Sequence, residues 1–321
     1  MSAPATHPTE ALLQRLEWTV IRRLDGLLQG DHRTLWRGAG LDLADLREYQ
    51  HSDDVRHIDW NVTARLNQPY VRQFTEDREH TAWFLVDLSA SVDFGSGDVT
   101  KRMLAASFVG VLARLLTRHG NRVGAILYGT QVDTVVPAGR GRHHVLHLLQ
   151  RIQARPGVSP PGATDLAELL RAAQLTLRRR ASVFVVSDFI SAPGWHTALA
   201  RLAMRHEVTA VRLFDPLERT LPDLGGVTLR DAESGEELWV DTHDRGFRAR
   251  FEALAREREQ TLRDGLEHAG VDTLELATDD DLFEALVRFT ELRKQHSRLS
   301  GGSASGARSP WASHLAVGGT A

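Results

Sequence analysis

The sequence predicts an α/β fold, namely a doubly wound, mostly parallel sheet of the Rossmann-like kind, preceded by an N-terminal helix and a charged extension. Segments of strand and helix character alternate from about residue 82 to 292. This alternation is typical of a parallel sheet with right-handed crossovers and helices on both faces. Two strand segments, 83–86 and 182–186, are almost wholly apolar, as expected for strands that are covered on both sides.

The elements follow from apolar periodicity and from the turn residues between them. We expect strands over residues 70–74, 82–86, 122–128, 131–136, 182–186, 208–214, 227–230, 237–240 and 272–276. We expect helices over residues 99–119, 143–152, 164–177, 195–205, 244–269 and 280–292. Gly129 and Thr130 indicate a hairpin, and Gly120 ends the helix before it. Residues 139–141 predict a turn, and the Pro- and Gly-rich residues 155–162 predict a loop.

Three regions are expected along the chain. They are an N-terminal helix with a charged segment (1–80), the α/β domain (81–296) and a disordered tail rich in Gly, Ser and Ala (297–321). The helix is predicted from apolar residues at helical spacing, with Thr9 as its N-cap and Gly30 at its end. We expect its apolar face to pack on the α/β domain.

The charged extension, residues 41–59, is dense in acids and arginines beside aromatic residues and matches neither a plain strand nor a plain helix. We interpret it as an ion-pair network that fixes a loop against the main domain, because arginine–carboxylate pairs are geometrically specific. The residues of this predicted network are Arg47, Asp53, Asp54, Arg56 and Asp59.

The composition excludes several classes of function. The chain has 321 residues, a net charge of −3 and no cysteine. The charge gives no global indication of nucleic-acid binding, and the lack of cysteine excludes disulfides, thiolate metal sites and cysteine nucleophiles. There is no signal-peptide pattern and no apolar run long enough to predict a membrane span, so we expect a cytoplasmic protein.

Oxygen-bearing side chains follow the apolar strands and open one helix. They are Asp87, Ser89, Ser91, Thr164 and Asp188. Any one of them fits an ordinary helix cap. Together, at the carboxyl ends of parallel strands where open α/β sheets bind ligands, they predict a site for a hard cation such as Mg²⁺ or Mn²⁺.

The D-x-S-x-S motif at residues 87–91, with a Thr after a Gly-rich loop and an Asp after a later strand, resembles the von Willebrand factor A (vWA) domain. In that family these residues form a metal-ion-dependent adhesion site. The resemblance implies that Ser89 and Ser91 are metal ligands and that Thr164 is a direct or water-mediated ligand. It implies that Asp87 and Asp188 hold coordinating waters, and that a carboxylate from a partner protein completes the site.

A second resemblance covers about residues 30–292. The runs DLREY (45–49) and DDVRHIDW (53–60), followed by Ala64 and Arg65, are similar to the DUF58 family. Ser52 stands where the family usually has Gly, and Val92 stands where Met often follows the second Ser. Many relatives begin with two membrane helices, which this chain lacks. The family's association with MoxR-type AAA+ ATPases implies such a partner here.

We weigh three functions. The first is a non-catalytic protein-interaction module that binds acidic groups of a partner through Mg²⁺, as an adaptor for a MoxR-type AAA+ ATPase. The second is a Mg²⁺-dependent phosphoryl-transfer hydrolase with Asp87 as nucleophile, which the Ser at position 89 disfavours because phosphatases of this type place a second acid there. The third is a structural subunit. The sequence has no P-loop motif for nucleotide hydrolysis.

One further metal candidate is a group of histidines on one predicted helix. His143 and His147 stand four residues apart, with His144 between them, and such a pair can bind a metal ion on one helical face. No third ligand accompanies them in the sequence. We therefore favour a solvated face.

Overall fold

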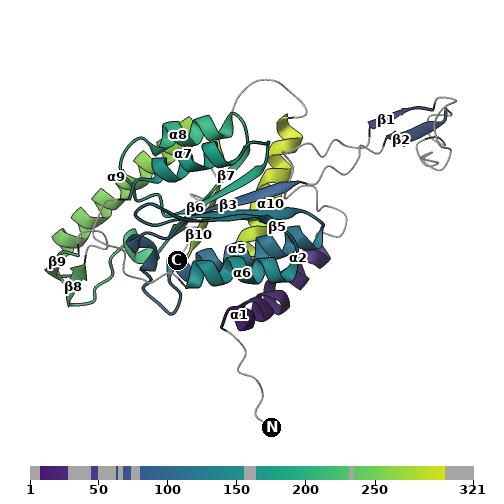
Figure 1. Ribbon diagram of the computed structural model, residues 1–321. Helices are drawn as coiled ribbons and strands as arrows, with labels where there is room; N and C mark the ends of the chain where they lie inside the picture. The colour runs from purple at the N-terminus through teal and green to yellow at the C-terminus, as the bar shows by residue number, and fades with distance from the viewer. Residues whose placement is uncertain are drawn as a thin grey trace, which may run out of the picture.

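The computed structural model describes residues 8–27, 45–49, 63, 68–73, 80–154, 164–230 and 235–300. The strands of its central sheet are β3 (Thr81–Asp87), β4 (Arg122–Tyr128), β5 (Val132–Gly139), β6 (Ser182–Ser187), β7 (Glu207–Phe214) and β10 (Asp272–Ala277). They lie in the order β10-β7-β6-β3-β4-β5 (Figure 1). All neighbours are parallel except β4 and β5, which form the predicted antiparallel hairpin. The predicted doubly wound, mostly parallel sheet is therefore confirmed.

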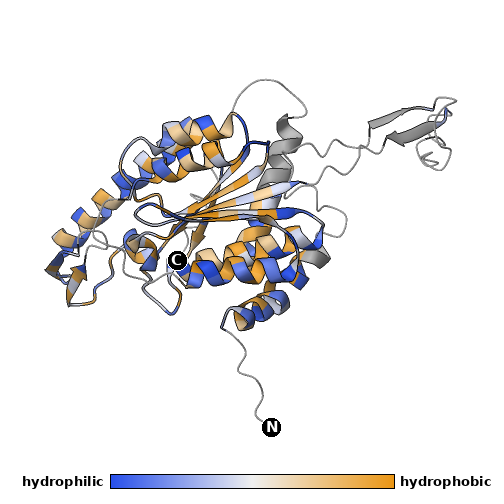
Figure 2. Ribbon diagram, viewed as in Figure 1, coloured by the Kyte–Doolittle hydropathy of each residue, from blue (hydrophilic) through white to orange (hydrophobic). Residues whose placement is uncertain are grey.

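Helices cover both faces of this sheet, as Figure 1 shows. One face carries α5 (Lys101–Arg118), α6 (Gly141–Gln153) and α10 (Leu282–Ser300), and the other carries α7 (Leu166–Thr176), α8 (Trp195–Ala203) and α9 (Arg245–Ala269). Successive side chains of a strand point to opposite faces, so Phe84 and Val86 enter the first core and Leu85 enters the second. Apolar residues accordingly fill the strands and line the inward helix faces (Figure 2).

The N-terminal helix is confirmed, although Thr9 is not its N-cap. It runs as α1 (Pro8–Leu16), a π-helical segment η1 (Glu17–Ile21) and α2 (Arg22–Leu27). The helix begins at Pro8. Proline suits the first helical position, because the backbone N–H that it lacks has no hydrogen-bond partner at that position in any case. Thr9 lies inside the helix, and its hydroxyl donates to Gln153 Oε1 of α6 at 2.8 Å. The predicted end at Gly30 lies outside the described residues.

The charged extension departs from its prediction in one respect. It contains a strand, β1 (Asp45–Glu48), which pairs antiparallel with β2 (Tyr70–Gln73). The alternating charges of the extension give no strand signal, since the pairing depends on a partner more than twenty residues away. Within the predicted ion-pair network, the acids and the arginine of residues 53–59 lie outside the described residues.

Two predicted boundaries shift in the structure. The expected turn over 139–141 is wrong, because β5 reaches Gly139 and Gly141 already begins α6. A Cβ at Gly139 would lie 2.5 Å from His144 Nδ1, so a larger residue there would require the His144 ring to shift. The last helix extends to Ser300, past its expected end at residue 292, and takes in residues 297–300 of the predicted tail.

A hairpin of β8 (Gly226–Arg230) and β9 (Glu237–Asp241) confirms the prediction for that segment. Figure 1 shows it beside the N-terminal end of α9. Further along α9, Glu259 pairs with the buried guanidinium of Arg212 on β7, and Arg219 joins the same group at 3.0 Å. These ion pairs fix the long helix to the sheet. None of the described helices combines the length and apolar character that crossing a membrane requires.

Candidate metal centre

The site begins where the two central strands end. β3 and β6 are parallel neighbours paired through Val86 and Val186, so the residues that follow these positions meet at the same edge of the sheet. Asp87 is the last residue of β3, and its Oδ2 accepts a hydrogen bond of 2.7 Å from the hydroxyl of Ser187, the last residue of β6. Asp188 follows directly. Both acids are buried.

The turn after β3 places the two predicted hydroxyls together. Ser89 N donates to Asp87 Oδ1 at 2.9 Å, which folds the chain back over the strand end. The short helix η3 (Ala90–Asp93) follows, with Ser89 at its N-cap position. As a result, Ser89 Oγ and Ser91 Oγ lie 3.2 Å apart, and both side chains are buried.

Thr164 lies just before α7 and is held at the same edge by the loop that follows β6. Its carbonyl oxygen accepts from Ser191 Oγ at 3.0 Å and from Ala192 N at 2.8 Å, and the residue is 2% exposed. The next residue, Asp165, is the N-cap of α7 and accepts from Ala167 N at 2.9 Å. The five predicted residues therefore occupy buried positions on three connected segments at the carboxyl edge of the sheet.

The two acids of the site repel one another. Burial, and next to it the charge of Asp188, raises the pKa of Asp87 to about 6, against the opposing effect of its hydrogen bonds from Ser187 and Ser89. A cation near both carboxylates relieves this repulsion. Among the described residues no three His, Cys, Asp or Glu side chains gather into a metal-binding group, so the donor set depends on hydroxyl oxygens. Such a set suits Mg²⁺ or Mn²⁺ rather than Zn²⁺.

A buried lysine at this site was missed by sequence reasoning. Lys101 begins α5, and its Nζ lies 2.7 Å from Asp188 Oδ2 and 2.5 Å from Glu218 Oε1. Burial lowers the pKa of Lys101, but the two carboxylates outweigh this effect and the net shift is upward. The sequence offers one signal for this residue, namely that lysine is rare in it: the chain has only one other lysine, Lys294. A lysine in the first turn of a helix otherwise looks like a surface residue.

Glu218 in turn belongs to a second buried group. It ends η4 (Pro216–Glu218), where its Oε2 accepts from Asp215 N at 3.1 Å. The Asp215 carboxylate accepts from Ser96 N at 2.8 Å and from Thr278 Oγ1 at 2.6 Å. Burial raises the pKa of Asp215, but these hydrogen bonds lower it by more. The loops after β3, β7 and β10 are thus tied together beside the candidate metal ligands.

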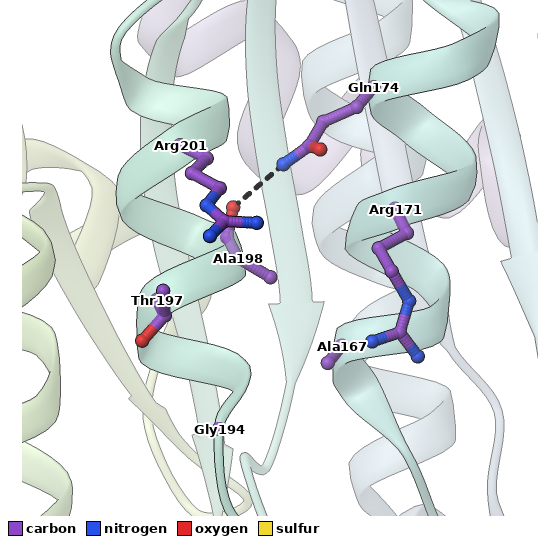
Figure 3. Close-up of a pocket in the computed structure, with 7 residues that line it drawn as sticks. All are labelled: Ala167, Arg171, Gln174, Gly194, Thr197, Ala198 and Arg201. Carbon is purple, nitrogen blue, oxygen red and sulfur yellow. Dashed lines mark hydrogen bonds between the residues drawn. The ribbon is translucent and has the colours of Figure 1, made fainter.

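Two other features lie apart from this group. His143 and His147 are exposed, and a nitrogen of His144 lies 2.7 Å from the Val123 carbonyl oxygen, which agrees with the predicted solvated face. A groove of about 110 Å³ between α7 and α8 is lined by Arg171 and Arg201 among others (Figure 3). Both arginines are exposed on the outer helix surfaces, so the groove does not belong to the buried site.

The sheet topology defines an α/β protein with a doubly wound, mostly parallel sheet, whose central strands end in acid and hydroxyl side chains. A family model described as "Protein of unknown function DUF58" matches residues 45–261. The chain belongs to the DUF58 family.

The chain is similar to several curated sequences and solved structures. Uncharacterized proteins of Mycobacterium bovis and Mycobacterium tuberculosis are 40% identical over 287 residues, covering 89% of this chain and 90% of theirs. An aerotolerance-related membrane protein of Bacteroides fragilis is 12% identical, with a TM-score of 0.47 over 67% of this chain and 99% of its own. The VWA domain of SpRpn10 is 13% identical, with a TM-score of 0.36 over 65% of this chain and 94% of its own.

Proposed function

We propose that this protein is a non-catalytic interaction module that binds an acidic side chain of a partner protein through a Mg²⁺ or Mn²⁺ ion. The observation that carries the proposal is the convergence of two buried carboxylates, Asp87 and Asp188, with the paired hydroxyls of Ser89 and Ser91 at one edge of the sheet. Buried charges of equal sign persist in proteins when a cation or a dense set of donors compensates them.

The roles of the residues follow from their chemistry. Ser89 and Ser91 supply neutral oxygen ligands, and Thr164 supplies a third. Asp87 and Asp188 supply negative charge and accept hydrogen bonds from metal-bound water. When bound, the ion supplies positive charge that few anionic ligands neutralise, so it favours one further carboxylate ligand. A partner with an exposed Asp or Glu has the complementary chemistry.

A MoxR-type AAA+ ATPase is the partner that we infer, with this chain as its adaptor. Membership of the DUF58 family supports this inference, because the family is associated with such ATPases. The ATPase supplies nucleotide hydrolysis, and the module described here supplies recognition.

The burial and the hydrogen bonds of Asp87 favour partner binding over phosphoryl transfer. A phosphoryl-accepting aspartate needs an oxygen that is free to attack the substrate. Asp87 is 0% exposed, and its two oxygens already accept hydrogen bonds from Ser89 N and Ser187 Oγ.

The test uses the full chain and a purified MoxR-type ATPase from the same genome, with binding measured in Mg²⁺ and in EDTA. We expect binding in Mg²⁺ only, and we expect Ser89→Ala and Asp188→Ala each to weaken it roughly 10- to 100-fold. Ser107→Ala is the matched control, because its hydroxyl donates to Met103 O within α5 and lies outside the site.

The outcomes separate the parts of the proposal. Binding that persists in EDTA and in both site variants contradicts a metal-bridged interaction. No binding by the wild-type chain under either condition contradicts the inferred partner. Phosphatase turnover that disappears in Asp87→Asn would replace the interaction module with the hydrolase.

A further inference from the structure

Lys101 is a charged side chain that the proposed ligand set does not require. Its side chain is 0% exposed, and its ammonium lies between Asp188 and Glu218. Lysines are almost never fully buried unless they are paired. This one is paired with an acid of the candidate metal set, so the protein carries its own cation at the place where a metal ion is proposed to bind.

Both oxygens of Asp188 are already engaged. Oδ2 accepts from Lys101 Nζ at 2.7 Å, and Oδ1 accepts from Ile190 N at 3.0 Å. An ionised carboxylate has capacity for further hydrogen bonds, but the ammonium neutralises much of the charge that attracts a divalent ion. A positive charge in contact with one acid of the site also repels the incoming metal directly.

Glu218 is the second carboxylate in contact with Lys101. Its side chain is 27% exposed, and its other oxygen accepts from Asp215 N, so η4 fixes its position. Glu218 thus shares the ammonium with Asp188 and leaves part of the Asp188 charge for a metal ion. Loss of the Glu218 charge would leave Asp188 as the only carboxylate in contact with Lys101.

We propose that Lys101 is a built-in counter-ion that weakens metal binding by the free protein, so that the ion is held firmly only when a partner carboxylate supplies further negative charge. This inference rests on the proposed metal-bridged function and explains how metal binding and partner binding depend on each other. Because such coupling is reciprocal, a partner that tightens metal binding is itself bound more tightly by the metal-loaded protein.

The experiment measures Mn²⁺ affinity of the full chain without a partner, by titration with MnCl₂ and the EPR signal of free Mn²⁺. Lys101→Met is expected to bind Mn²⁺ about tenfold more tightly or better, as one contacting charge shifts the pKa of a neighbour by at least about one unit. Glu218→Gln keeps the lysine and is expected to bind about threefold more weakly or worse. The two variants therefore move the affinity in opposite directions.

Arg102→Met is the matched control. This variant also removes one positive charge, at the next position of α5. Arg102 Nη2 donates to Asp93 Oδ2 at 2.8 Å, and Arg102 does not pair with Asp188. The Mn²⁺ affinity of this variant is expected to stay within about twofold of the wild-type value, because the charge that it removes is paired with Asp93 and not with an acid of the candidate site. Adding Ser89→Ala to Lys101→Met is expected to abolish the gained affinity, which assigns that affinity to this site.

A purely structural lysine predicts the opposite result. Its removal would disorder Asp188 and leave Mn²⁺ affinity unchanged or lower. That outcome, in a Lys101→Met variant whose circular dichroism is native, overturns the inference while metal-dependent partner binding by the wild-type chain stands. If Lys101→Met does not fold, Glu218→Gln decides, and an unchanged affinity there overturns the inference. Absence of Mn²⁺ binding in every variant, Lys101→Met included, also overturns it.

Discussion

At the scale of single residues, Asp87 gives the clearest pH-dependent prediction. Its pKa in the folded protein is about 6, against an ordinary value of 3.8, because of burial and the charge of Asp188. The folded state therefore holds a proton on Asp87 more firmly than the unfolded state does. The stability from this group is fully present below about pH 4 and is lost as the pH rises through about 6.

The prediction is tested with Asp87→Asn, which keeps the shape of the side chain and cannot ionise. In EDTA, the free energy of unfolding of the wild type is expected to fall relative to that of the variant between pH 4 and 7, on the order of 3 kcal/mol. Urea unfolding at a series of pH values measures this difference. A difference that does not change with pH would contradict the assignment of this pKa to Asp87.

The residues of the candidate site differ in how far the sequence could predict them. Asp87 and Asp188 follow apolar strands, and parallel strands bring their carboxyl ends to one edge, so the local sequence placed both acids. Lys101 was missed because its partners lie 87 and 117 positions away along the chain. Periodicity gives no information about ion pairs at that separation, and the three-dimensional packing of α5 against η4 determines them.

At the scale of elements, the attachment of α9 depends on one buried ion-pair group. Arg212 is 6% exposed and contacts Glu275 of β10 at 2.7 Å as well as Glu259 of α9. Arg212→Met leaves the two acids with the partly exposed Arg219 and with Arg263, which lies 4.0 Å from Glu259. We expect a loss of about 3 kcal/mol in the free energy of unfolding. The matched control is Arg256→Met on the same helix. Arg256 forms an exposed pair with Glu252 at 3.4 Å, and its removal is expected to cost less than about 0.5 kcal/mol.

Urea unfolding measures both variants, and hydrogen exchange along α9 locates the change. Faster exchange around Glu259 is expected in Arg212→Met alone. Equal effects of the two substitutions would show that burial does not distinguish these pairs. The sequence predicted α9 itself, over residues 244–269, from its apolar spacing, and the structure places Asp244 at its N-cap and Gly270 at its C-cap. It did not predict β1, because a strand of charged residues is specified by its partner strand.

At the scale of the whole molecule, the folded unit begins earlier in the chain than the part that the family model matches. The DUF58 model begins at residue 45, whereas the core includes residues of the N-terminal helix such as Leu13 and Ile21, both 0% exposed. Ion pairs from Glu10 to Arg142 at 2.9 Å and from Glu17 to Arg114 at 2.7 Å join this helix to α6 and α5. The packing predicted from its apolar face is therefore present, and the helix is part of the α/β core.

This arrangement gives a prediction about stability far from the candidate site. Leu13→Ala is expected to reduce the free energy of unfolding by about 2–5 kcal/mol, because it removes buried methyl groups and leaves a cavity between the helix and the core of the sheet. Trp18→Ala is the control on the same helix. Trp18 is 67% exposed, and its ring stacks on Arg22 at 3.6 Å, so a loss below about 1 kcal/mol is expected. Denaturant unfolding should give one cooperative transition in which Leu13→Ala lowers the midpoint of the whole protein. A separate early transition in Leu13→Ala would instead mean that the N-terminal helix detaches while the sheet stays folded.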